Sequence, residues 1–347
     1  MISALAVLCG VKNPLMKDSL TASSNRLNFL DSVRGVAILM VVAIHATSYV
    51  PSLPEGVIWF VNILCKSVAV PIFFLVDGYI FHLKNRSLKY FSYIKSSFNR
   101  LIVPWLSFLF IYSCARFLFE FYGDAERYIY GRSFYEVLLF SYNSVVAMQL
   151  YFLPALFLVR AMLPALRLFS GSRLTVKIIM FAVYVVLYRA VDASFLNALS
   201  VDGGLEPIRH ALWGGQFYLL GIMASSFVLS EIWKLLLPVL SIGLLLAGSY
   251  YNESVYMYLF QYAYLLSIFY LSVYFGNGLE WLGGYTMAIY LLHAPVLMKI
   301  ISIGLLKTPA GPVVVFLLLV FFTCVVSVIA YKQLDKFSIL KPLFGDR

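Results

Sequence analysis

Three ionisable side chains lie on one apolar stretch near the start of the chain, "LDSVRGVAILMVVAIHATSYV" at residues 30–50. In a helix, Arg34 and His45 are eleven residues apart, close to three full turns, so both point to the same side about 16 Å apart along the axis. Asp31 lies one turn before Arg34. An arginine can hold an anionic ligand at one end while a neutral imidazole takes a proton from a hydroxyl at the other. Alternatively, His45 hydrogen-bonds a neighbouring helix and Arg34 only marks the cytosolic end.

The next two apolar stretches each carry a further charge. Asp77 lies in "VPIFFLVDGYIF", and Arg100 opens the third stretch in "SSFNRLIVPWLSF". Arg34 and Arg100 together place two guanidinium groups at one face of a membrane, which favours a phosphate-bearing ligand. An unpaired carboxylate inside a bilayer is costly, so we expect Asp77 to form an ion pair with Arg34 or Arg100.

The remaining histidines and the cysteines give weaker signals. His293 lies deep in "AIYLLHAPVL" and is compatible with either a structural or a functional role. We interpret His82 and His210 as interfacial. The four cysteines have neither CxxC nor Cys/His spacing, so we predict no metal site and no disulfide bond: they are Cys9, Cys65, Cys114 and Cys324.

Composition places these residues in a membrane protein. The 347 residues are 62% hydrophobic and only 12% charged, with a mean hydropathy of +0.89, whereas soluble domains carry roughly 25% charge. The net charge of +10 is typical of basic cytosolic loops, so we expect membrane lipid and not nucleic acid as a partner.

The apolar segments predict an all-α polytopic membrane protein, a bundle of about ten transmembrane helices, because a spanning helix needs roughly 20 apolar residues. The fourth segment is over-long and contains Pro154, so a short interfacial piece followed by a span is expected there. No internal repeat or soluble domain separates the segments, which cover residues 33–53, 60–82, 100–120, 136–165, 174–192, 208–228, 231–249, 254–275, 281–303 and 312–331.

Lysine and arginine predict the orientation, since cytosolic loops are enriched in both. With the N-terminus in the cytosol, 17 of the 26 basic residues fall on the cytosolic side and 5 on the outer side. Both termini are therefore predicted to be cytosolic, with an even number of spans. Four basic residues fall inside spans: Lys66, Arg116, Arg160 and Lys299.

The domain organisation follows from these segments. We predict a cytosolic N-terminal lead over residues 1–29, a membrane domain over residues 30–332, and a cytosolic C-terminal tail over residues 333–347. "MISALAVLCG" is too short to span a membrane and lacks the basic region of a secretory signal. Translation from Met16 is a simple alternative start.

Six motifs occur in order across residues 30–300 and together resemble acyltransferase family 3, the integral membrane O-acyltransferases. They are "VRGVAILMVVAIH", "PIFFLVDGYIF", "FNRLIVPWL", "QLYFLPALFLVRAMLP", "FYLLGIMAS" and "GGYTMAIYLLHAPVL". Three departures from the family pattern bear on donor and acceptor choice. Asp77 stands where serine is usual, Ser97 replaces the first arginine of an Arg-x-x-Arg pair, and "GGYT" replaces "Gly-x-x-Ser".

The resemblance implies an enzyme of the bacterial inner membrane that moves an acetyl or other short acyl group from cytosolic acetyl-CoA to a hydroxyl of an envelope glycan or its lipid-linked precursor. On this hypothesis, Arg34 and Arg100 hold the CoA phosphates and His45 is the general base. Asp31, Asp77 and His293 are further candidate site residues. Candidate donors to the developing oxyanion are Tyr290, Tyr151 and Asn143.

Three other functions remain compatible with the sequence. A transporter or flippase for a lipid-linked glycan or small solute would also use intramembrane charges, although no inverted repeat or matched pair of broken helices is visible. A glycan polymerase would call for a larger outer loop. A non-catalytic scaffold or sensor with the same fold is the third alternative. Binding of acyl-CoA separates the enzyme from the transporter, and turnover by the purified protein separates it from the scaffold.

Overall fold

The computed structural model describes residues 19–84, 89–122, 148–191, 206–226, 230–251, 254–272 and 278–345, and every element in these ranges is helical. The all-α class is therefore confirmed for the described part of the chain. The principal helices are α2 (Ser19–Ala46), α3 (Glu55–Val61), α4 (Ala69–Lys84), α5 (Tyr90–Ser97), α6 (Val103–Tyr122), α8 (Phe152–Ala161), α9 (Leu163–Gly171), α10 (Leu174–Val191), α12 (Glu206–Ala224), α13 (Glu231–Tyr251), α14 (Ser254–Leu271), α15 (Glu280–Gly284), α16 (Thr286–Leu292), α17 (Met298–Leu305) and α18 (Pro312–Leu334).

Short helical turns join several of these helices. Four of them bear on the site or on its surroundings. They are the 3₁₀ turn η2 (Thr47–Tyr49), the π-helical turns η5 (Phe98–Ile102) and η9 (His293–Leu297), and the 3₁₀ segment η10 (Ser338–Phe344). Two further turns are the π-helical η3 (Asn62–Lys66) and the 3₁₀ turn η6 (Met148–Tyr151).

Seven helical segments of the described residues are long and apolar enough to cross a membrane, which makes the chain an integral membrane protein. An eighth is possible if α8 and α9 form one span, although they bend by 65° at Met162. This bend lies near the end of the predicted segment 136–165. Residues 136–147 of that segment lie outside the described residues. Helix α14 is shorter than a full span, so the count of ten remains a prediction.

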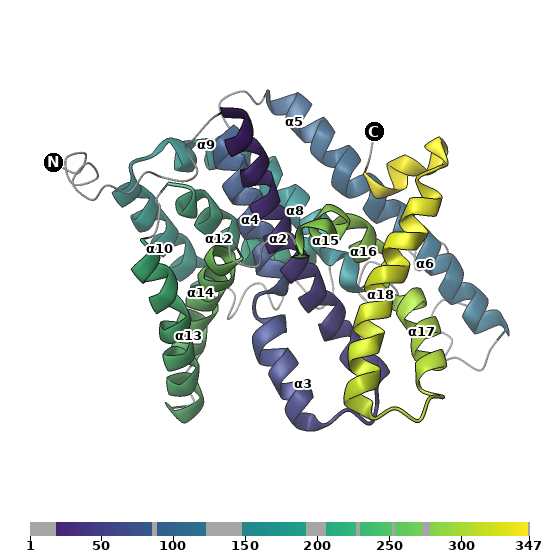
Figure 1. Ribbon diagram of the computed structural model, residues 1–347. Helices are drawn as coiled ribbons and strands as arrows, with labels where there is room; N and C mark the ends of the chain where they lie inside the picture. The colour runs from purple at the N-terminus through teal and green to yellow at the C-terminus, as the bar shows by residue number, and fades with distance from the viewer. Residues whose placement is uncertain are drawn as a thin grey trace.

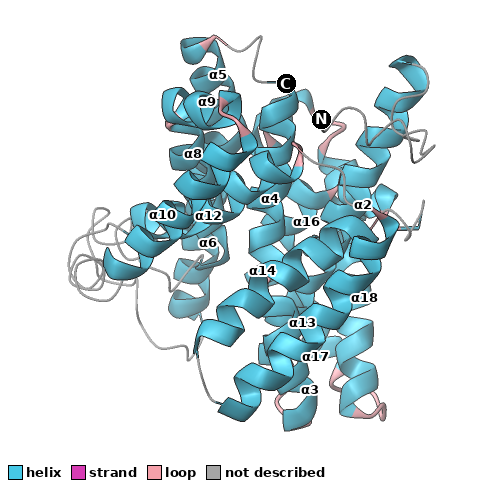
Figure 2. Cartoon of the chain, turned by 90° about the vertical axis from the view of Figure 1, so that its left-hand side faces the viewer, coloured by secondary structure: helices cyan, strands magenta, loops and turns pink. Residues whose placement is uncertain are grey.

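Helix α2 runs through the middle of the molecule (Figure 1) and contacts α4, α15, α16 and α18. Its apolar side chains form the core, with Val33, Ile38 and Val42 fully buried. Helices α13 and α14 form a pair at one flank, which faces the viewer in Figure 2. The residues with chemistry on α2 are therefore surrounded by other helices of the bundle.

Helices α4 and α12 cross so closely that glycine is required on both. A Cβ on Gly221 would lie 2.0 Å from the carbonyl oxygen of Leu75, and one on Gly78 would lie 2.0 Å from that of Tyr218. Both glycines let the backbones touch, as small residues commonly do between membrane helices. The same α12 also contacts α8 and α10, so α4 and α8 pack against a common helix and their side chains meet, as in the ring contact of Phe74 with Phe152.

The predicted span 281–303 is not one continuous helix. It is divided into α15, α16, η9 and α17, and Ala294 within η9 has extended backbone angles (φ −136°, ψ 155°). Pro295 has no N–H to donate to a helical hydrogen bond, so a break here has a local cause. Beyond α18, the residues predicted to form a tail fold back as η10 and contact α6, with Phe344 buried against Phe108 and Tyr331.

Candidate active site

A cavity of about 230 Å³ opens among α2, α4, η5, α8 and the α15–α16 corner. Its polar lining comes from Arg34, Asp77, Arg100, Arg160 and Tyr290, and its apolar lining includes Phe152 and Leu156. We call it the Arg34 cavity. Three guanidinium groups from three different segments thus converge on one space.

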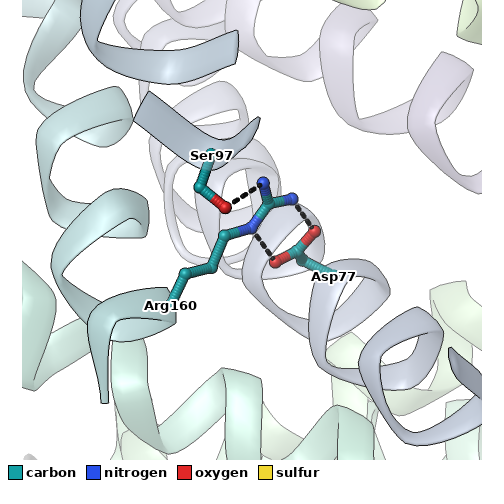
Figure 3. A network of polar contacts seen from close by, with 3 residues as sticks. All are labelled: Asp77, Ser97 and Arg160. Atoms are coloured by element: carbon teal, nitrogen blue, oxygen red, sulfur yellow. Dashed lines mark hydrogen bonds and ion pairs between the residues drawn. The ribbon is translucent and has the colours of Figure 1, made fainter. Parts of the chain in front are cut away.

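The structure pairs Asp77 with Arg160 rather than with Arg34 or Arg100, so our expectation for Asp77 was wrong. Nε of Arg160 donates to Oδ2 of Asp77 at 2.8 Å, and its Nη2 donates to Oδ1 in a second hydrogen bond (Figure 3). Nη1 of Arg160 lies 3.5 Å from the Ser97 hydroxyl. Such two-pronged pairs fix geometry as well as charge. The pairing follows from the α4–α12–α8 packing, which brings Arg160 closer to Asp77 than the other arginines.

Arg34 is oriented by its own helix. Its Nη1 lies 2.7 Å from Oδ1 of Asp31, one turn earlier on α2. Two of the three guanidinium groups at the cavity, those of Arg34 and Arg160, are therefore held by carboxylates, and Arg100 contributes the third guanidinium group to the lining. A site of this composition favours an anion.

A glycine sets the position of Asp31. A Cβ on Gly283 of α15 would lie 1.8 Å from the Asp31 carbonyl oxygen, whereas a Cβ on the neighbouring Gly284 would meet nothing within 4 Å. Both glycines line the cavity. Gly283, the first residue of "GGYT", therefore lets α15 lie directly against the turn of α2 that carries Asp31 and Arg34.

Tyr290 lines the Arg34 cavity and lies next to a pair of histidines. Its ring centroid is 6.3 Å from that of His293, and the rings of His293 and His45 are 5.1 Å apart at 51°. His293 is fully buried and His45 is partly buried. The pair therefore lies just beyond the cavity lining, which does not itself include His45.

The surroundings of His293 determine which of its nitrogens carries the proton. Nδ1 faces two acceptors, the carbonyl oxygens of Ile289 at 3.0 Å and Tyr290 at 2.9 Å, so Nδ1 must be the donor. In the neutral ring Nε2 is then an acceptor. Nε2 is buried, and it has no hydrogen-bond partner among the described residues.

Side chains from three other segments hold the helix break around His293. Nε2 of Gln149 donates to the carbonyl oxygen of Ala294 at 2.6 Å. The Tyr49 hydroxyl donates to the carbonyl oxygen of Pro295 at 3.3 Å. The Tyr112 hydroxyl donates to the carbonyl oxygen of Leu291. Carbonyl groups released by a broken membrane helix need such partners. The segment that presents His293 is thus fixed from several sides.

Comparison with known proteins agrees with this geometry. A family model described as an acyltransferase domain matches residues 27–332. The chain belongs to acyltransferase family 3. Searches of curated proteins and of solved structures gave no match. The resemblance predicted from the six motifs is confirmed, and the chain is a membrane acyltransferase.

The structure gathers most, but not all, of the candidate residues of this acyltransferase. Arg34, Arg100, Asp77 and Tyr290 line one cavity, Asp31 holds Arg34, and His45 meets His293 beyond it. Tyr151 lies elsewhere. Its ring is 4.2 Å from that of His210, and the two line a separate cavity of about 220 Å³ with Arg209 and Trp213. Asn143 lies outside the described residues.

Sequence reasoning missed two residues of the acyltransferase site, Arg160 and Gln149. A signal for Arg160 existed, since it and Asp77 are opposite charges within predicted spans of a chain with few charges, and buried charges pair. Gln149 gave no comparable signal. Its role depends on the break at Ala294, which a continuous helix over 281–303 would not contain.

Proposed function

We propose that this acyltransferase moves an acetyl or other short acyl group from acyl-CoA to a sugar hydroxyl of a bacterial envelope glycan or its lipid-linked precursor. The observation that carries the proposal is the placement of an arginine-lined cavity directly beside the His45–His293 pair. One part of the site suits an anion and the other suits a proton transfer.

The donor is the ligand that the Arg34 cavity suits. Arg34 and Arg100 can bind phosphate oxygens through their guanidinium N–H groups, and CoA carries several phosphates. A volume of about 230 Å³ is below the range of roughly 300–1,000 Å³ usual for a complete drug-sized ligand. Only part of a molecule as large as CoA therefore enters, and the thioester end extends toward Tyr290.

The histidine pair is the base of the proposed reaction. The acceptor oxygen forms a bond to the acyl carbon while its proton passes to His45. The carbon–sulfur bond then breaks, and the CoA sulfur leaves with the proton returned by His45. His293 stays neutral beside it, because two adjacent imidazolium ions would repel each other in a poorly solvated site.

The test is acetyl-CoA turnover by detergent-purified protein with a crude envelope glycan extract as acceptor. We expect His45→Ala to lower the rate by roughly 10²- to 10⁴-fold, the usual contribution of a general base, with unchanged expression and CoA binding. The control is His82→Ala, since His82 contacts Ser170 away from the cavity. Wild-type turnover by His45→Ala would refute the role of His45. Absence of CoA binding by the wild type would refute the donor and favour the transporter.

A further inference from the structure

A second cavity, of about 570 Å³, lies on the other side of the histidine pair. It is lined by Tyr49, Tyr112, Arg116, Pro295, Lys299 and neighbouring apolar side chains. We call it the Lys299 cavity. Helix α2 and the turn that follows it pass Arg34, then His45, then Tyr49. The two cavities are therefore at opposite ends of this segment, with the histidines between them.

The Lys299 cavity contains two of the four basic residues that fall inside predicted spans. Nε of Arg116 lies 2.7 Å from Oε1 of Glu120, whose side chain is fully buried, so the charge of Arg116 is balanced. Lys299 has no ion pair among the described residues. A charge within a membrane span is costly and usually serves a ligand or a pathway. Among the described residues, Lys299 adds to this cavity a positive charge that no carboxylate pairs with.

The rest of the lining is apolar and partly open to the surroundings. Phe119, Ile300 and Ile303 are 57%, 61% and 49% exposed, on helices that the sequence predicts to span the membrane. A ligand in this cavity must therefore have an apolar part beside an anionic group. The size falls within the usual range for a small-molecule site.

The spacing between the cations and the histidines is short. Arg116 is four residues beyond Tyr112, and Lys299 is four residues beyond Pro295, so each lies about one helical turn, or roughly 6 Å, farther along its helix. Pro295 follows His293 by two residues. Lys299 therefore lies six residues beyond His293, roughly 9 Å along the chain axis. Because side chains on a helix tilt back toward its N-terminus, the lysine can reach toward the histidines, and a hydroxyl at the histidines and an acidic group at Lys299 can belong to one sugar unit.

The geometry points to the Lys299 cavity as the binding site of the acyl acceptor, and to an acceptor that carries a carboxylate or phosphate beside its reactive hydroxyl. This inference rests on the proposed function, since it assigns the donor and the acceptor to opposite ends of the same histidine pair. Lys299 selects the anionic acceptor, and the apolar lining accommodates a hydrocarbon chain.

The test compares two matched probes, octyl β-glucuronide and octyl β-glucoside, which differ only in a carboxylate. Binding of each is measured to the full-length protein in phosphatidylcholine nanodiscs, with no acyl-CoA present. We expect the wild type to bind the glucuronide about tenfold more tightly, as for one additional charge-assisted hydrogen bond. Lys299→Gln should remove that preference, and Lys299→Arg should retain it.

The matched control is Lys307→Gln, which removes an exposed lysine on the same side that does not line the cavity. Equal binding of both probes by the wild type, or an unchanged preference in Lys299→Gln, would overturn the inference. Association of phosphatidylglycerol is measured in parallel, in nanodiscs to which this lipid has been added. If Lys299→Gln reduces only that association, the cavity is a lipid site and the inference also fails. Because no acyl-CoA is present, these results do not depend on turnover, so they separate this inference from the proposed function.

Discussion

The rings of His45 and His293 lie 5.1 Å apart, although 248 positions separate them in the chain. His45 lies in the last turn of α2, the helix that also carries Arg34, and His293 begins the break between α16 and α17. The two carbonyl groups that face Nδ1 of His293 leave Nε2 as an acceptor. A basic nitrogen is therefore fixed beside the proposed general base, between two cavities of different character.

Removing the acceptor nitrogen of His293 tests its part in catalysis. In His293→Asn the amide N–H can replace Nδ1 as a donor to the Ile289 and Tyr290 carbonyl oxygens, but no nitrogen remains at the Nε2 position. We expect kcat to fall by about 10²-fold or more with little change in the KM for acetyl-CoA. His293→Ala should also reduce thermal stability, because it leaves the carbonyl groups without a donor. An unchanged kcat in a folded His293→Asn variant would show that His293 is only structural.

The Asp77–Arg160 ion pair predicts a strong coupling between the two positions. Both side chains are about 15% exposed, so removing one partner leaves a poorly solvated charge. We expect Asp77→Asn to lower the free energy of unfolding by about 2–5 kcal/mol, measured by denaturation in detergent. The double variant Asp77→Asn/Arg160→Gln should be less destabilised than the sum of the single variants. Additive effects would show that the pair does not contribute through its charges.

The sequence alone predicts how candidate residues on one helix lie relative to each other. Helical periodicity alone placed Arg34 and His45 on one side of α2, and the composition and apolar segments predicted the all-α class. Relations between helices could not be read in this way. Asp77 pairs with Arg160 because α4 and α8 both pack against α12, and α12 crosses α4 closely at Gly78 and Gly221. The local sequence around Asp77 does not predict that helix crossing.

Pro295 is a cause of the break at Ala294 that can be seen in the sequence, but the contacts that result from the break cannot be predicted from the sequence. A single span over 281–303 fitted the hydrophobicity, and only the tertiary structure supplies Gln149, Tyr49 and Tyr112 as donors to the released carbonyl groups. Tyr151 gives a second example. It lies within the motif "QLYFLPALFLVRAMLP", which also contains Arg160, yet its ring lies 4.2 Å from that of His210, in another cavity.

The contact between α15 and α2 predicts different effects for two adjacent glycines. In Gly283→Ala the new methyl group would overlap the Asp31 carbonyl oxygen, so α15 must move and Asp31 with it. We expect a loss of about 1–3 kcal/mol in stability, as for other overpacked sites, and a higher KM for acetyl-CoA. Gly284→Ala is the control for stability, since its methyl group meets no atom within 4 Å. Equal melting temperatures for the two variants would contradict the tight contact.

Salt should reveal whether Arg34 and Arg100 bind the donor phosphates. Arg34→Gln and Arg100→Gln should each raise the KM for acetyl-CoA about 10-fold without lowering kcat, because the lost contacts are with a group remote from the reaction. Each variant should also show a weaker dependence of KM on ionic strength, since one cation no longer attracts the donor. Lys95→Gln is the control, as Lys95 is exposed on α5 and does not line the cavity. If Lys95→Gln raises KM as much as the arginine variants, the donor is attracted by the general positive charge of that surface, and the Arg34 cavity is not its phosphate site.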